Sequence, residues 1–452
     1  MLSKSCSTNF LVIVIPLLCV SSFGGAQQAP PDQLAKVLER LDQLEKQNQD
    51  LLNEIHALRQ ELRSAQSGQS ADLETLQEKA EVASHRIDEQ AQTKVQASQR
   101  FPVSLTGMFL FDAFLTKNSS ADATYSSTYE NYSLGSAGGG VTLRQSIFGL
   151  TFGGPEVFAG GHVNGFLSMD FYGSDPSRGG FRIRRGAVTF DWKRRSITFG
   201  QDKSILSPFQ PDSYARVGTP PAAGAGNLWL WRPQVTYEER IPLTERTTLA
   251  LQASLFETNE YYTVASLPTG SDPIRPRPAV QAHARIRRTW SDNSRFEAGF
   301  GADSSTSHVL GQSVPSRLVS ADFLIKPAAW IQISGTLITG KNFANLGGVP
   351  GGVSLVNNDV RAVRGSAGWA QLAFPVTSRL TFNVYGGVQA NNPQDLTPYA
   401  PLRTHLIASN VMYRIAPNVV LSFEGAQYHL DEYWNGFVFP TTRYDATVAY
   451  LF

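Results

Sequence analysis

The chain has 452 residues, which allows one large domain or two to three ordinary ones, and its net charge is only +1. A balance so close to neutral argues against a strongly electrostatic partner such as nucleic acid. Charged residues make up 17 % and aromatic residues 11 % of the sequence, so the chain carries fewer charges than the roughly 25 % of ordinary soluble domains.

Residues 1–26 predict a secretory signal peptide. A positive charge at Lys4 precedes the apolar run from Phe10 to Val20, and small residues lead up to Ala26, where we expect cleavage. The apolar run is too short to span a bilayer as a helix, which needs roughly twenty residues. No later run is long enough either, so the mature chain would cross a membrane only with strands.

Both cysteines, Cys6 and Cys19, lie in this segment. Cys19 as a lipoprotein acceptor is an alternative, but Leu18 before it is bulkier than the small residue expected there. The mature chain is therefore expected to form no disulfide and no cysteine-bound metal site, and we expect no cofactor.

Residues 27–100 predict an α-helical coiled coil, a stalk in the periplasm. Apolar residues recur every seven positions, and again three positions further on, over about four and a half heptads. The two seam columns are Leu34, Leu41, Asn48, Ile55 and Leu62, and Val37, Leu44, Leu51, Leu58 and Ala65. So narrow a stripe requires partner helices, and the polar Asn48 would fix their register and number. A lone amphipathic helix lying on the following domain is the alternative.

From Val103 onward the hydrophobic period changes to two, which predicts β-strands. We expect about sixteen of them, over residues 103–115, 141–152, 158–172, 181–193, 196–202, 231–241, 246–256, 279–290, 294–304, 316–327, 329–340, 362–375, 378–390, 402–415, 418–430 and 441–452. Most are about ten to thirteen residues long, enough to cross a bilayer at a tilt.

The connections between these strands alternate in length. Short turns are expected at 153–157, 193–195, 242–245, 291–293, 326–328, 375–377 and 416–417, and longer segments at 116–140, 173–180, 203–230, 257–278, 305–315, 341–361, 391–401 and 431–440. Outer-membrane barrels have tight periplasmic turns, long external loops and an even number of antiparallel strands. Residues 101–452 therefore predict an all-β transmembrane barrel of about 16 antiparallel strands, in the outer membrane of a Gram-negative bacterium.

The last predicted strand alternates polar with apolar and aromatic residues up to a terminal phenylalanine. A closed barrel must pair its last strand with its first, because hydrocarbon offers no water to an open edge. The alternating run also resembles the recognition signal that outer-membrane barrels carry for their assembly machinery. The residues that would form this membrane-assembly signal are Tyr444, Val448, Tyr450 and Phe452.

A barrel of this size encloses an aqueous channel, so its inward-facing residues would set the selectivity. In three predicted strands polar and basic residues alternate with apolar ones, and arginine on the lipid face would cost about 2 to 4 kcal/mol at the membrane midplane. The candidate anion-selecting residues that line the pore are Arg182, Arg184, His283, Arg285, Arg287 and Arg379. Rings of arginine favour anions.

Two features of this lumen leave alternatives open. Inward carboxylates are able to pair with the arginines and neutralise them, in which case the arginines would not select anions. The candidate carboxylates are Asp170, Glu238, Glu297 and Asp303. The tryptophans lie mostly near predicted strand ends, and we interpret them as an interfacial belt rather than a path for stacking sugars. They are Trp192, Trp229, Trp231, Trp290, Trp330 and Trp369.

The third long connection, residues 203–230, is rich in proline, glycine and alanine. A loop of this length is usually either functional or disordered. By analogy with porins in which the third external loop narrows the lumen, its candidate constriction residues are Lys203, Asp212, Tyr214 and Arg216.

Three short stretches are similar to the DcaP-like outer-membrane porins: ITFGQ at 197–201, WRPQVTYEER at 231–240 and GWAQLAF at 368–374. The order of signal peptide, coiled coil and barrel also resembles that family, and the resemblance covers nearly the whole mature chain. It implies a trimeric porin that passes small anions such as dicarboxylates. It matches no set of substrate-binding residues position by position.

We therefore interpret the chain as an outer-membrane porin, a passive diffusion channel for small hydrophilic, preferentially anionic solutes. It contains no nucleophile elbow, HExxH helix or phosphate loop, so we do not expect an enzyme. The expected partners are outer-membrane lipid, the solutes, the barrel-assembly machinery and further copies of the chain in a trimer, with peptidoglycan as a further candidate. The alternatives are an envelope-tethering protein with a plugged barrel, and a general or sugar-permeable pore.

Overall fold

The computed structural model describes residues 46, 49–58, 103–119, 132–173, 180–258, 277–349, 351–356, 359–434 and 436–452. The chain divides into two compact units, residues 1–95 and residues 96–452. The predicted signal peptide and most of the predicted stalk lie outside the described residues, as do the seam residues Leu34, Leu41, Asn48 and Leu62. No helix among the described residues is long and apolar enough to cross a membrane.

In the first unit, residues 49–58 form an α-helix. The seam residues Leu51 and Leu58 are exposed on it, and Ile55 is half-buried. These three positions lie on one side of a helix, because they are separated by three and four residues.

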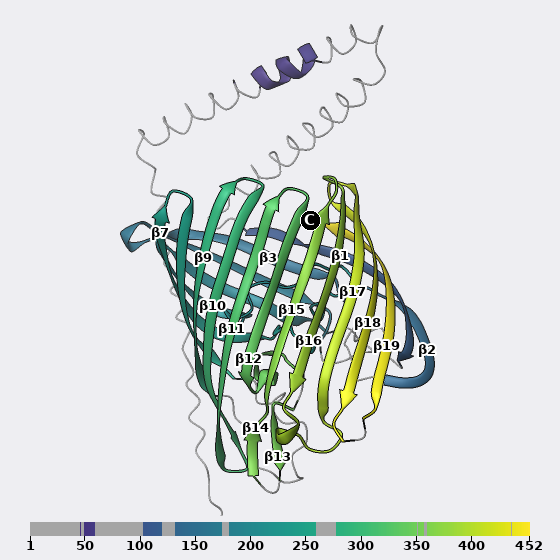
Figure 1. Ribbon diagram of the computed structural model, residues 1–452. Helices are drawn as coiled ribbons and strands as arrows, with labels where there is room; N and C mark the ends of the chain where they lie inside the picture. The colour runs from purple at the N-terminus through teal and green to yellow at the C-terminus, as the bar shows by residue number, and fades with distance from the viewer. Residues whose placement is uncertain are drawn as a thin grey trace, which may run out of the picture. The chain divides into compact units, whose positions relative to one another are not determined.

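The second unit is a closed antiparallel barrel (Figure 1). Its strands are β1 Val103–Ser119, β2 Tyr132–Thr142, β3 Ile147–Val157, β4 Gly161–Asp170, β5 Arg182–Asp191, β6 Arg195–Lys203, β7 Trp231–Thr244, β8 Thr247–Glu257, β9 Pro278–Ser291, β10 Ser294–Val309, β11 Gln312–Ala328, β12 Ile331–Lys341, β15 Arg364–Pro375, β16 Leu380–Asn391, β17 Pro401–Ala416, β18 Val419–Glu432 and β19 Val438–Leu451. Most strands pair with their neighbours along the chain, which is the topology of an up-and-down barrel. The exceptions are β3, which pairs with β1 instead of β2, and β12, which pairs with β15.

Pairing of β1 with β19 closes the barrel, in a register that runs from Met108 opposite Leu451 to Lys117 opposite Thr442. The other edge of β1 pairs with β3 along its first half and with β2 along its second half. Because β2 and β3 share one place beside β1, the 17 segments of the sheet make sixteen barrel positions. The predicted strand count is confirmed.

The predicted second strand, 141–152, is interrupted in the structure at residues 143–146. At this break the Ser146 hydroxyl accepts a hydrogen bond from the Leu110 backbone N–H at 2.9 Å and so replaces a ladder bond. Serine side chains compete with backbone partners in this way. The break turns Gln145 toward the inside of the barrel, where it contacts Ala215.

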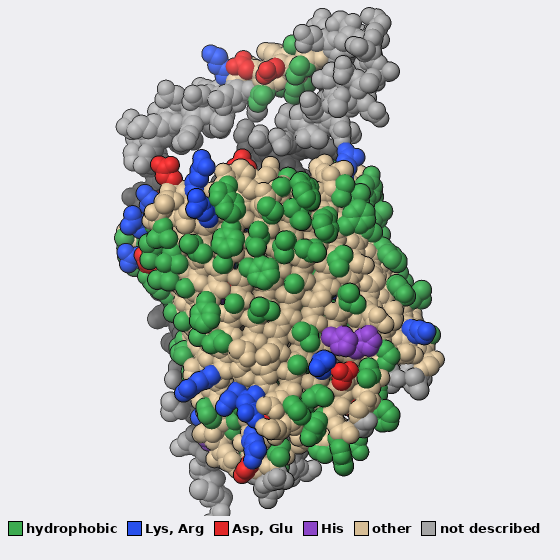
Figure 2. All heavy atoms as spheres, in the orientation of Figure 1, with side chains coloured by type: hydrophobic (Ala, Val, Ile, Leu, Met, Phe, Trp, Pro, Cys, Tyr) green, Lys and Arg blue, Asp and Glu red, His purple; other side chains and the backbone are tan. Residues whose placement is uncertain are grey.

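Side chains alternate between the two faces of the wall. In β1, Leu110 and Asp112 point inward and are fully buried, whereas Phe109, Phe111 and Leu115 point outward and are exposed. Figure 2 shows that hydrophobic side chains cover the middle of the outer wall in this view, while most charged ones gather toward the ends. The barrel thus has an apolar outside and a polar inside, the reverse of a soluble domain.

One predicted long loop, 305–315, is wrong. Strands β10 and β11 continue to a two-residue turn at Leu310 and Gly311, which both have positive φ, 50° and 76°. This is the backbone of the tight hairpin turns whose twist matches that of the strands. The serine-rich composition of this part of β10 is typical of a loop. Its residues nevertheless alternate between the two faces of the wall up to the turn.

The remaining loops carry small elements of their own. They are the 3-10 turns η1 Phe158–Gly160, η2 Phe343–Leu346 and η3 Pro393–Asp395, and the hairpin of β13 Val353–Val356 and β14 Asp359–Ala362. The turn η2 packs against the loop between β6 and β7 in one apolar cluster, which includes Leu206, Leu228, Phe343 and Leu346. This cluster stabilises the loop within the barrel.

Candidate pore constriction

The loop between β6 and β7, residues 204–230, folds back into the barrel and is called the inner loop below. Its backbone lies against the inner wall: an ideal Cβ on Gly226 would lie only 2.0 Å from the Gly368 carbonyl oxygen, and one on Gly387 2.0 Å from that of Ala225. Only glycine allows so close an approach. The small residues of the loop therefore let it pack flat on strands β15 and β16.

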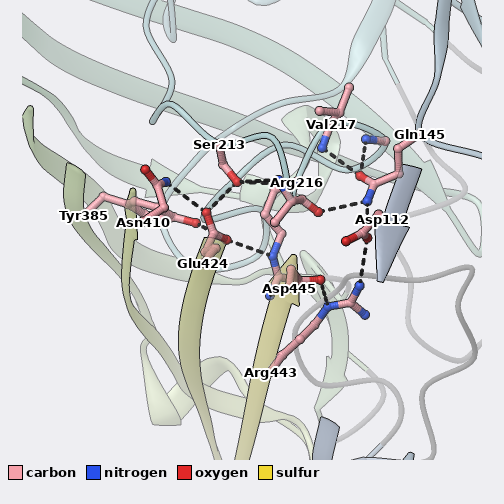
Figure 3. Close-up of polar contacts among 12 residues, drawn as sticks. Asp112, Gln145, Ser213, Arg216, Val217, Tyr385, Asn410, Glu424, Arg443 and Asp445 are labelled. Carbon is pink, nitrogen blue, oxygen red and sulfur yellow. Dashed lines mark hydrogen bonds and ion pairs between the residues drawn. The ribbon is translucent and has the colours of Figure 1, made fainter. Parts of the chain in front are cut away.

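A buried arginine fastens the inner loop to the far wall (Figure 3). The Arg216 guanidinium lies 3.4 Å from Glu424 of β18 and 3.9 Å from Asp445 of β19, and its carbon is 4.9 Å from the centre of the Tyr428 ring. These acidic and basic side chains are at most 1 % exposed. Burial alone would lower the pKa of Arg216, but Tyr428, Asp445 and Glu424 together raise it well above its ordinary value, so this arginine stays charged.

Glu424 is the centre of the fastening. Its carboxylate accepts hydrogen bonds from the hydroxyls of Ser213 at 2.6 Å and Tyr385 at 2.8 Å, and from the Asn410 amide at 3.0 Å. The same amide donates to the Asp212 carbonyl oxygen at 2.9 Å. A buried carboxylate requires such a set of donors, since an unpaired one is costly.

Gln145 provides a second fastening. Its side-chain oxygen accepts from the backbone N–H groups of Val217 at 2.8 Å and Gly218 at 3.0 Å. Its amide group donates to the Ala215 carbonyl oxygen and to Asp112, each at 2.9 Å. The break between β2 and β3 is therefore the feature that brings this glutamine under the loop.

Two predicted pore-lining residues, Arg182 and Arg184, form the third fastening. Both pair with the fully buried Asp170, at 2.6 and 3.1 Å, and both donate to loop carbonyl oxygens, Arg182 to Gly218 at 2.7 Å and Arg184 to Val217 at 2.6 Å. They also lie over the ring of Trp231, at 5.2 and 4.6 Å. They point inward, but Arg184 is buried and holds the loop instead of facing open water.

The predicted residues His283, Arg285 and Arg287 also share the inward face of β9. His283 is buried, with Nε2 2.6 Å from Asp322 of β11, so it too is covered. Arg285 and Arg287 lie instead beside Glu297, together with Arg295 of β10. Arg379 does not lie on a strand: β16 begins at Leu380, and Arg379 is exposed in the turn before it.

The basic cluster around Glu297 is the part of the wall with the most exposed positive charge among the predicted pore-lining residues. Glu297 lies 3.9 Å from Arg285, 3.2 Å from Arg287 and 3.4 Å from Arg295. The carboxylate is 1 % exposed, but the three arginine side chains are 19, 53 and 44 % exposed. The negative charge is therefore covered while the positive charges face solvent. We call these four residues the arginine cluster.

The predicted constriction residues divide into two pairs. Asp212 and Tyr214 line a hollow of about 370 Å³ together with Lys326 of β11. Asp212 is exposed to the lumen, but the surrounding barrel desolvates its carboxyl and raises the pKa, against a smaller lowering by its hydrogen bond with Gln371. Lys203 lies at the end of β6, with its ammonium 3.4 Å from the Pro208 carbonyl oxygen, and Arg216 is the buried fastening described above.

The predicted tryptophan belt is partly wrong. Trp192, Trp290 and Trp330 lie at the short-turn ends of the strands, as a belt requires. Trp369 is buried beneath the inner loop, in one cluster with Tyr385 and Ala222, and Trp231 is buried under the arginines of β5. These two stabilise the loop. The predicted membrane-assembly residues Tyr444, Val448 and Tyr450 are exposed on β19. Phe452 follows that strand, is also exposed, and exchanges two backbone hydrogen bonds with Gly107 of β1.

Several residues of the site were not predicted: Gln145, Glu424, Arg443, Asp445 and Arg295. The alternation in β10 that places Glu297 inward also places Arg295 inward, so the sequence pattern could have predicted Arg295. Glu424 and Asp445 meet the inner loop from strands far away along the chain, and Gln145 meets it from the break between β2 and β3. Arg443 pairs with Asp445 at 2.7 Å and with Asp112 at 3.4 Å beside them. The sequence holds no local signal for these contacts. Within the described ranges, no group of three or more His, Cys, Asp or Glu side chains is placed to hold a metal ion.

No protein-family profile matches the chain, and no curated protein sequence matches it. Among solved structures, the outer membrane channel DcaP of Acinetobacter baumannii superposes with a TM-score of 0.63 at 18 % identity, over 78 % of this chain and 97 % of that one. The anion-selective porin from Comamonas acidovorans superposes with a TM-score of 0.51 at 13 % identity, over 78 % of this chain and 100 % of that one. Residues 96–452 thus share the barrel fold of these outer-membrane channels.

Proposed function

We propose that the protein is an outer-membrane porin, a passive diffusion channel for small hydrophilic solutes that prefers anions. The sixteen-position barrel with an apolar outside and a polar inside supports the channel, since barrels of this size enclose water. The inner loop narrows that lumen. The short turns would face the periplasm and the longer loops the outside.

The arginine cluster carries the anion preference. One covered carboxylate balances only one of its three arginines, and those arginines remain exposed. Exposed positive charge in a narrow aqueous path raises the local concentration of anions and excludes cations. The superposed porin from Comamonas acidovorans is anion-selective, which agrees with this proposal. Small dicarboxylates are the solutes that the family resemblance implies.

The test is the reversal potential of single channels in a planar bilayer under a KCl gradient. We expect stepwise conductance with a reversal potential on the anion side. The double variant R287Q/R295Q should shift that potential toward the cation side, because the cluster then loses both excess positive charges and only the balanced pair of Glu297 and Arg285 is left. The shift should shrink as the salt concentration rises, since salt screens exposed charges.

The matched control is Arg288→Gln. Arg288 follows Arg287 on β9 and lies opposite Phe296, so it belongs to the outward-facing set. The same loss of charge on that face should leave the reversal potential unchanged. An equal shift in the double variant and the control would contradict the anion path, and a silent bilayer from folded protein would favour the plugged, tethering barrel instead.

We propose further that the stalk associates the barrels into trimers in the outer membrane, with the coiled coil in the periplasm. Leu51 and Leu58 are exposed along one side of the described helix, next to Ile55, and apolar seam residues on a single helix require partner helices.

A further inference from the structure

A hollow on the outer wall of the barrel is not used by the proposed channel. It has a volume of about 490 Å³ and lies where the turn between β5 and β6 meets η1 and β7. Its lining residues are Phe158, Ala159, Trp192, Lys193, Arg194, Arg195, Ile197 and Tyr237. We call it the turn hollow.

The floor of the turn hollow is aromatic and apolar. Phe158 is 80 % exposed, and its ring lies 5.6 Å from that of Trp192. The indole N–H of Trp192 donates to the Phe158 carbonyl oxygen at 2.9 Å. Gly161 makes room for this indole, because an ideal Cβ there would lie only 2.4 Å from its nitrogen. The exposed ring of Phe158 is thus held in place and has no protein cover among the described residues.

The rim of the turn hollow is basic. Lys193, Arg194 and Arg195 are consecutive and exposed, and no described carboxylate lies within ion-pair distance of any of the three. Glu239, which lies opposite Arg195 in the strand register, instead accepts the Tyr237 hydroxyl at 2.5 Å. The hollow therefore combines three unneutralised positive charges with an apolar floor.

The turn that carries these basic residues is fixed from the side of β7. The Arg240 guanidinium pairs with Asp191 and donates to the carbonyl oxygens of Trp192 at 2.6 Å and Arg195 at 3.1 Å. The Arg240 backbone N–H donates to the Arg194 carbonyl oxygen at 2.6 Å. The backbone of the turn is thus fixed, so a ligand that binds there does not have to order it.

We propose that the turn hollow binds an anionic phospholipid, with the phosphate on the basic rim and the start of an acyl chain on the ring of Phe158. The proposal rests on the membrane location given above, which puts short turns beside the inner leaflet, where phospholipid headgroups lie. Charge complementarity selects an anionic headgroup over a zwitterionic one, since each basic residue near an anionic lipid surface favours binding. Aromatic side chains at the same level suit the boundary between headgroup and chain.

The experiment uses Trp192 as its own reporter. The full-length protein is reconstituted in nanodiscs that contain brominated phosphatidylglycerol or brominated phosphatidylcholine in a common lipid background, and tryptophan fluorescence is measured. Subtracting the signal of a Trp192→Phe variant isolates the quenching at Trp192. We expect phosphatidylglycerol to quench it with at least about fivefold higher apparent affinity than phosphatidylcholine.

Two triple variants then separate the site from the overall charge. K193Q/R194Q/R195Q should abolish the preference for phosphatidylglycerol, whereas R246Q/R288Q/R379Q, which removes three positive charges outside the hollow, should keep it. Loss of the preference in both variants would overturn the proposal, because it would then reflect net charge. Circular dichroism and heat-dependent gel mobility confirm that each variant is folded.

The remaining outcomes are distinct. Equal quenching by both lipids in the wild type would show that Trp192 contacts lipid without selecting the headgroup, as any interfacial tryptophan does. That result would overturn the proposal. Quenching of Trp290 and Trp330 without Trp192 would show that protein covers the hollow, which overturns the lipid site but leaves the porin intact. No quenching of any tryptophan would show that the barrel is not in the bilayer, and the proposed function would fail with the inference.

Discussion

At the scale of single residues, exposure decides what a charged side chain does in this barrel. Arg184 is buried, paired with Asp170 and bonded to the inner loop, and Arg216, within that loop, is buried and paired with Glu424 of the wall. Both charges are therefore used inside the protein. Arg287 and Arg295 share one covered carboxylate and face solvent. The sequence shows that a residue lies on the inward face, but it does not show whether a loop will cover it.

Asp212 gives a prediction at the same scale. Desolvation by the surrounding barrel raises the pKa of its carboxyl, and the exposed side chain lines the same hollow as Lys326. Because the pKa is raised, the carboxylate takes up a proton earlier than an ordinary aspartate as the pH falls. The lumen then loses a negative charge, so the anion-to-cation permeability ratio should rise between pH 7 and pH 4.

The variant Asp212→Asn checks this assignment in the same bilayer measurement. It should have the higher permeability ratio already at pH 7 and change less on acidification than the wild type. If both proteins respond equally to pH, another carboxylate controls the lumen.

At the scale of elements, the inner loop depends on its buried fastenings. Replacing Arg216 by Met keeps a similar volume but leaves Glu424 and Asp445 without this guanidinium. Removing one partner of a buried ion pair costs about 3 to 5 kcal/mol. We therefore expect R216M to lower the free energy of unfolding in detergent, measured by urea titration, and to add current fluctuations as the loop loosens.

Asp359→Asn is the control for that comparison. It breaks the Asp359–Arg361 pair at 3.0 Å, whose side chains are 69 and 45 % exposed, and exposed pairs contribute only about 0 to 1 kcal/mol. Equal effects of the two variants on stability would mean that the network around Glu424 does not anchor the loop.

The strands were largely predictable because each one has to separate an apolar face from a polar one, and this alternation is local. The prediction of strands failed at two places. At the serine-rich end of β10 the composition hides the alternation, and at β2 and β3 two segments share one barrel position. The inner loop was predictable in its length but not in its contacts. Arg216 contacts Glu424 and Asp445, which lie more than 200 residues further along the chain. No periodic pattern in the sequence indicates such a contact.

At the scale of the whole molecule, the barrel and the stalk are expected to have separable roles. All residues of the proposed anion path lie in the compact unit 96–452, and the described helix lies in the unit 1–95. Deleting residues 27–95 should therefore leave the reversal potential of each channel unchanged.

The same deletion should weaken the oligomer, because the exposed leucines at positions 51 and 58 belong to the removed segment. Native mass spectrometry of the two proteins in detergent measures this directly: trimers for the full chain, and a larger share of monomers after the deletion. A deletion variant that stays fully trimeric would place the trimer contacts on the barrel instead of the stalk. One that loses its ion selectivity would show that the stalk contributes to the permeation path, which contradicts the division of roles.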